Sequence, residues 1–82
     1  MNKIIEQLTE ALGWYGVLAI LAAYGLLSFH IVTSDSLPYH LLNLTGGVGL
    51  MIDAYADKNY QPVVLNLIWV AIAIFAIGRV FI

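Results

Sequence analysis

The sequence predicts an all-α integral membrane protein, an up-down-up bundle of three transmembrane helices. Three observations predict this class. Hydrophobic residues make up 62% of the 82 residues and charged residues only 10%, too few to cover the surface of a soluble domain. Most charged and turn-forming residues gather in the first twelve positions and in two short connections, which leaves three long apolar segments. A segment of about 20 apolar residues spans the ~30 Å hydrocarbon core of a bilayer.

The N-terminal segment, residues 1–12, is amphipathic, with Ile4, Ile5 and Leu8 on one helical side and the charged residues on the other. Two interpretations stay open. The segment lies in the membrane interface, or it is a solvated extension of the first transmembrane helix. Gly13 would permit a bend between the two.

The first transmembrane helix is predicted at residues 14–32, a stretch without a charge. Trp14 and Tyr15 begin it, and amphipathic rings of this kind anchor at the headgroups. A stripe of small residues at i, i+3 and i+7 is typical of a close helix contact. The stripe is Gly16, Ala19 and Ala23.

The second helix, predicted at residues 39–56, separates two kinds of side chain. On a helical period one face is small and polar, and it consists of Asn43, Gly46, Gly47, Leu50, Asp53 and Ala54. The opposite face is bulky and suits lipid. A small, polar stripe on a membrane helix favours another helix or a cavity beside it, and Gly46 and Gly47 are the predicted packing positions.

The third helix is predicted at residues 62–82, with Asn66 and Trp69 on one face. Pro62 suits its first turn. The two connections are short, and short connections make successive helices antiparallel neighbours. Residues 1–82 are therefore expected to form one membrane domain.

Charge predicts the orientation and excludes some partners. Lys3 and Lys58 fall on one side of the predicted bundle and Arg79 on the other, which favours a cytoplasmic N-terminus and an exported C-terminus; dual insertion is the alternative. The net charge of -2 predicts no nucleic-acid partner.

Catalytic chemistry and cofactors are not expected. The chain has no cysteine. No nucleophile has a plausible base and orienting partner, so the protein is predicted not to be an enzyme. His30 and His40 bracket the first connection with only Asp35 nearby, too few ligands for a metal.

Six residues are candidates for a polar pathway through the membrane: Asn43, Asp53, Asn66, Trp69, Tyr24 and His30. Asp53 would couple a proton or a cation, or it is an interfacial carboxylate reaching toward Lys58. Asn43 and Asn66 would contact a solute, or they are contacts between helices, which amides in lipid commonly form.

A homo-oligomer, most simply a dimer, is expected in the lipid bilayer. Its tight contacts are expected at small residues of the second and first helices: Gly46, Gly47, Gly16, Ala19 and Ala23. Three helices cannot enclose a pocket of about 300 Å³ or more, whereas six can.

Two functions follow from the polar residues. One is a permease with a small-molecule substrate. The other is a non-transporting scaffold or accessory subunit, in which the same residues pack helices; a channel or a lipid-binding protein are further alternatives.

Two stretches carry a resemblance. Tyr39, Asn43 and Gly46 form Y-x-x-x-N-x-x-G, and Pro62, Asn66 and Trp69 form P-x-x-x-N-x-x-W. This pair resembles a family of small, uncharacterised bacterial inner-membrane proteins, often described as permeases. More distantly, Tyr55, Pro62 and Asn66 are similar to the tyrosine, proline and asparagine of SemiSWEET and PQ-loop transporters, three-helix units that pair into sugar carriers. That similarity implies a substrate contact for Asn66, although Phe29-His30 stand where those proteins have a Pro-Gln pair.

Overall fold

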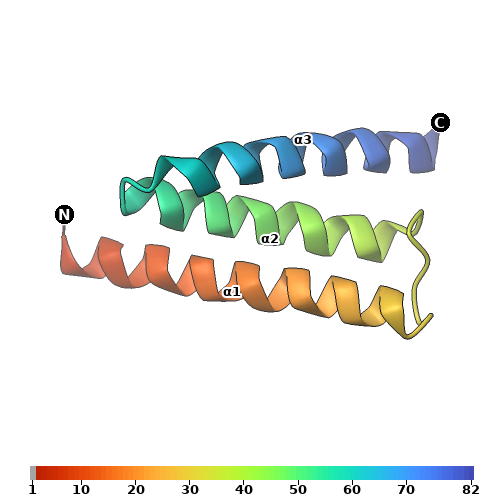
Figure 1. The fold of residues 1–82 in the computed structure, drawn as a ribbon, viewed down its shortest axis with the longest axis horizontal. Helices are drawn as coiled ribbons and strands as arrows, with labels where there is room; N and C mark the ends of the chain where they lie inside the picture. The colour runs from red at the N-terminus through yellow and green to blue at the C-terminus, as the bar shows by residue number, and fades with distance from the viewer. Residues whose placement is uncertain (1) are drawn as a thin grey trace.

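The chain forms three α-helices and no strand within residues 2–82, the part that the computed structural model describes. The helices are α1 (Lys3–Ser28), α2 (Leu37–Ala56) and α3 (Tyr60–Phe81). The predicted all-α class is confirmed. Figure 1 shows successive helices running antiparallel, with the N-terminus and the α2–α3 turn at one end and the α1–α2 loop and C-terminus at the other.

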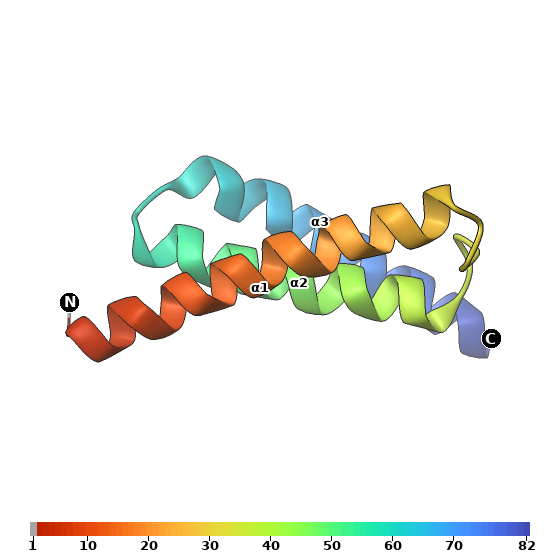
Figure 2. The same cartoon turned by 90° about the horizontal axis from the view of Figure 1, so that it is seen from below.

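The helices lie in an open row rather than a closed bundle. α1 and α3 each pack on α2, while no Cα atom of α1 comes within 8 Å of one in α3 (Figures 1 and 2). The buried apolar residues are small ones from all three helices: Ala19, Ala23, Ala54, Val70 and Ala73. The packing therefore depends on close backbone approach to α2, the central helix.

α1 is continuous through Gly13, so the amphipathic N-terminal segment extends the first helix without a bend. Its start is capped, because the Ile4 N–H donates to the Asn2 side-chain oxygen at 2.7 Å. At 26 residues the helix is about 39 Å long, longer than the ~30 Å hydrocarbon core.

α1 ends at Ser28 rather than at the expected Val32. The His30 N–H donates to the Leu27 carbonyl at 3.1 Å and the Ile31 N–H to the Leu26 carbonyl at 2.9 Å. His30 has the left-handed φ of 63°. These are the bonds of a Schellman motif, which closes a helix. α2 ends in the same way, with Lys58 at a φ of 58°.

Adjacent glycines of α2 serve different neighbours. A Cβ atom on Gly46 would lie 3.1 Å from the Gly16 carbonyl oxygen of α1, whereas one on Gly47 would lie 3.0 Å from Val70 Cγ2 of α3. Residues one apart on a helix point about 100° away from each other. The small residues expected between protomers thus pack inside one chain.

The outer surface of the row is apolar. Large hydrophobic side chains of α1 and α3, among them Leu18, Leu21, Leu65 and Phe75, are exposed. Both helices are long and apolar enough to cross a membrane. α2, predicted as the third spanning helix, is not among the helices that are apolar enough by this measure; it carries Asn43 and Asp53 among its glycines.

Candidate functional site

A small cavity between α2 and α3 holds the first candidate pair, Asn43 and Trp69. Asn43 is only 7% exposed. Its Nδ2 donates to the Tyr39 carbonyl at 3.1 Å, and its Oδ1 accepts from Trp69 Nε1 at 3.4 Å. The second bond is long for N–H···O geometry, so the Asn43 oxygen is loosely held. The cavity has a volume of about 180 Å³, and Tyr39, His40, Ile72 and Ala73 complete its lining.

Asn66 lies apart from this cavity, at the contact between α3 and Gly47. It is also 7% exposed, and its Nδ2 donates to the Pro62 carbonyl at 2.8 Å. Both buried amides therefore donate to a carbonyl one turn earlier on their own helix. Only Asn43 also bonds to a neighbouring helix.

Asp53 lies on the other side of α2, where its carboxyl group occupies the space left by the missing side chain of Gly13. A Cβ atom on Gly13 would collide with the Asp53 carboxylate. Gly13 therefore makes room for Asp53 rather than bending α1. This pairing could not be predicted from the sequence, because the contact between Gly13 and Asp53 depends on the register of α1 against α2.

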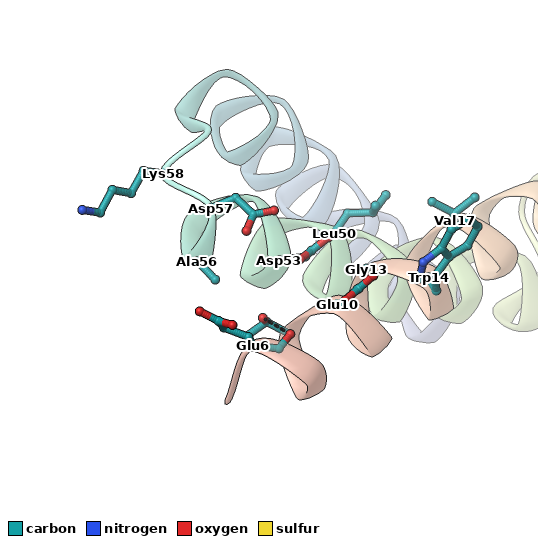
Figure 3. A pocket seen from close by; sticks show the side chains of 11 residues that line it. Glu6, Glu10, Gly13, Trp14, Val17, Leu50, Asp53, Ala56, Asp57 and Lys58 are labelled. Atoms are coloured by element: carbon teal, nitrogen blue, oxygen red, sulfur yellow. Dashed lines mark hydrogen bonds between the residues drawn. The ribbon is translucent and has the colours of Figure 1, made fainter. Parts of the chain in front are cut away.

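Asp53 lines an acidic groove of about 720 Å³ between α1 and the end of α2. The carboxylates of Glu6, Glu10 and Asp57 line the same groove. Lys58 is at its rim, with its side chain pointing away from these carboxylates (Figure 3). Within residues 2–82, no three His, Asp or Glu side chains are close enough to hold a metal ion.

Tyr24 and His30 lie outside both of these spaces. Tyr24 is 68% exposed on α1, and His30 is in the turn that closes that helix. Of the six pathway candidates, the structure brings Asn43 and Trp69 together. It places Asn66 and Asp53 at separate contacts of α2.

A polar link between α1 and α2 was missed in the sequence. The Tyr15 hydroxyl lies 2.6 Å from Thr45 Oγ1. Thr45 already donates to the Leu41 carbonyl at 2.8 Å, so Tyr15 is the donor. Tyr15 looked like a headgroup anchor, and only the antiparallel register shows that its ring reaches the middle of α2.

A protein-family model, belonging to a family without a described function, matches residues 9–82. No curated protein and no solved structure matches the chain. The similarity to SemiSWEET and PQ-loop transporters thus has no support beyond the residues of the motif.

Proposed function

Since the chain belongs to this uncharacterised family, we propose a function from its geometry: a small membrane protein that forms a homo-oligomer and passes a small solute along a pathway containing Asn43 and Trp69. The membrane part rests on the apolar surface. A soluble protein buries the apolar sides of its helices, whereas α1 and α3 are mostly exposed. Lipid is the surrounding that such a surface suits.

The observation that carries the pathway is the buried Asn43 amide at the α2–α3 cavity. An amide oxygen with only a long bond to Trp69 can accept a stronger bond from a solute. The cavity of about 180 Å³ is smaller than the ~300 Å³ of the smallest usual ligand pockets. A second copy against the uncovered edge of the row would enlarge it, which is why the proposal includes an oligomer.

The remaining candidates have supporting roles in this proposal. Asn66 lies along the same helix as Trp69 and would contact the solute further along the path. Asp53, with the acidic groove around it, would attract a proton or a cation that drives transport. The chain would lie in the bacterial inner membrane with Lys3 and Lys58 on the cytoplasmic side.

One observation favours a second function, the non-transporting scaffold. The Asn43 and Asn66 amides donate to their own helices, and the small residues complete their packing within one chain. In a scaffold, these residues would have no role beyond packing the helices. The exposed helix faces would then hold another membrane protein.

Swelling of proteoliposomes in a panel of small neutral solutes, such as glycerol, urea and alanine, separates these functions. The permease predicts faster entry of at least one solute than in protein-free liposomes. It also predicts that Asn43→Ala changes that rate by about tenfold, which corresponds to about 1.4 kcal/mol. The control Ile68→Ala, on the exposed side of α3, should leave the rate unchanged. Rates equal to those of empty liposomes for every solute would contradict transport by this pathway.

A further inference from the structure

A third hollow is lined by residues of the α1–α2 loop, the first turn of α2 and the last turns of α3. These segments lie at the end of the molecule opposite the α2–α3 turn, on the right of Figure 1. The hollow has a volume of about 600 Å³. Polar side chains line one part and apolar side chains the other. The residues that matter are Ser34, Asp35, His40, Phe75, Arg79 and Val80.

The hollow contains one permanent positive charge. The Arg79 guanidinium carbon lies 5.9 Å from the centre of the Phe75 ring, a cation–π distance. Phe75 and Arg79 are one turn apart on α3, so this contact holds the guanidinium along the helix, beside the hollow. A guanidinium presents several N–H donors in a plane, which suits the oxygens of a phosphate.

The same hollow contains one negative charge. Asp35 accepts a hydrogen bond from the Thr33 hydroxyl at 2.6 Å. This bond is the main cause that lowers the pKa of the Asp35 carboxyl, and His40 contributes a smaller electrostatic effect. Asp35 is therefore ionised at neutral pH, and it comes from the loop, whereas Arg79 comes from α3.

We propose that this hollow binds the headgroup of a phospholipid that carries both a phosphate and a primary ammonium group. Arg79 binds the phosphate, Asp35 binds the ammonium group, and Ser34 and His40 supply further polar contacts. Phe75 and Val80 face the glycerol and the first carbons of the acyl chains. The proposal rests on the membrane location proposed above.

Charge complementarity selects this headgroup over simpler ones. A lipid with only a phosphate would bring its negative charge next to Asp35, and a purely cationic molecule would meet Arg79. Like charges in a shared site disfavour binding. A headgroup with both charges pairs with both residues, and a primary ammonium group also donates hydrogen bonds to the Asp35 carboxylate, which the quaternary ammonium of phosphatidylcholine cannot do. Free phosphoethanolamine has the same charges but lacks the apolar part that Phe75 and Val80 would cover.

The position of the hollow along the helices fits a headgroup. α2 has 20 residues and α3 has 22, which gives lengths of about 30 and 33 Å, close to the ~30 Å hydrocarbon thickness. The hollow lies at the ends of both helices, so it falls at headgroup depth when they span a bilayer.

Native mass spectrometry of the purified full chain, with defined lipids added, tests the proposal. The probes are phosphatidylethanolamine, phosphatidylglycerol and phosphatidylcholine of identical acyl chains. We expect phosphatidylethanolamine to remain bound at about tenfold lower concentration than the other two. Arg79→Gln should lower retention of all three lipids. Asp35→Asn should remove the preference for phosphatidylethanolamine while leaving a phosphate-dependent component.

The control Lys58→Gln removes a charge at the other end of the chain and should leave the preference intact. Equal retention of the three lipids by the unaltered protein would overturn the proposal, as would an unchanged preference in Asp35→Asn. Asp35 is exposed in a loop, so this variant stays informative if Arg79→Gln fails to fold. Competition by soluble phosphoethanolamine alone, at equal affinity, would overturn a lipid as the ligand.

Extraction of cell membranes with alkaline carbonate separates this failure from that of the proposed function. A protein that stays in the membrane but shows no lipid preference contradicts the headgroup site alone. A protein that carbonate releases contradicts the membrane location, and the headgroup site with it.

Discussion

At the scale of single residues, the glycines differ in whether an added Cβ atom would collide with a neighbouring helix. A Cβ atom on Gly16 would lie 2.5 Å from the Gly46 carbonyl oxygen, whereas one on Gly25 meets nothing within 4 Å. Both glycines are in α1. The first makes the α1–α2 contact possible, and the second lies on an open side of the helix.

We therefore expect Gly16→Ala to lower the free energy of unfolding by about 1–3 kcal/mol, the usual cost of overpacking. Gly25→Ala should be neutral or stabilise by up to about 1 kcal/mol, because alanine favours a helix. Thermal unfolding in detergent, followed by circular dichroism, measures both. Equal effects of the two substitutions would contradict the α1–α2 register.

The Tyr15–Thr45 hydrogen bond is a second contact of residue scale. Tyr15→Phe removes the donor and should lower stability by about 0.6–1.7 kcal/mol, the range of hydrogen bonds between membrane helices. Tyr24→Phe is the matched control, since Tyr24 is on the same helix and exposed. In a double-mutant cycle with Thr45→Val the losses should not add; additive losses would show that the bond is not formed.

At the scale of elements, the sequence predicts the existence and order of the three helices but not all of their ends. Their apolar length identifies them. The predicted end of the first helix was four residues too far along the chain, because Phe29, Ile31 and Val32 continue the apolar run past Ser28. α1 ends because His30 adopts a left-handed conformation. Glycine usually occupies such a position, and a histidine there does not predict a helix end.

His30→Gly tests this account of the helix end. A left-handed conformation costs a non-glycine residue about 1–2 kcal/mol, so glycine should stabilise the chain by up to about that amount. Lys58→Gly should do the same at the end of α2. Thermal unfolding measures both, and solute entry into proteoliposomes should not change. Destabilisation by either substitution, or a loss of transport in His30→Gly, would contradict a role limited to ending the helix.

At the scale of the whole molecule, the central position of α2 decides which candidates meet. The small, polar face of α2 was predicted, yet not its division between two neighbours. That division depends on the angle at which α1 and α3 approach, which periodicity does not contain. Asn43 and Trp69 meet because α2 and α3 are antiparallel in that register, while Tyr24 is exposed on α1. The acidic groove depends on the register of α1 in the same way.

The open row predicts a pattern of disulfide cross-links, which the cysteine-free chain suits well. A disulfide needs Cα atoms closer than about 7 Å. Cysteines at Gly47 and Val70, across the α2–α3 contact, should cross-link within one chain. Cysteines at Ala23 and Ala73 should not, because α1 and α3 do not approach. The cross-links are detected by gel mobility after oxidation at low protein concentration. A cross-link of the second pair within one chain would indicate a closed bundle.

Single-cysteine labelling distinguishes a membrane-spanning row with a hydrated pathway at Trp69 from other arrangements of the chain. Ser34→Cys, Lys58→Cys, Trp69→Cys and Ile68→Cys are treated with a membrane-impermeant thiol reagent, in intact cells and in inverted vesicles. Positions 34 and 58 should react from opposite sides, position 69 should react, and its exposed apolar neighbour at 68 should be protected by lipid. Reaction of positions 34 and 58 from the same side would contradict the spanning helices. Protection of both 68 and 69 would contradict the pathway.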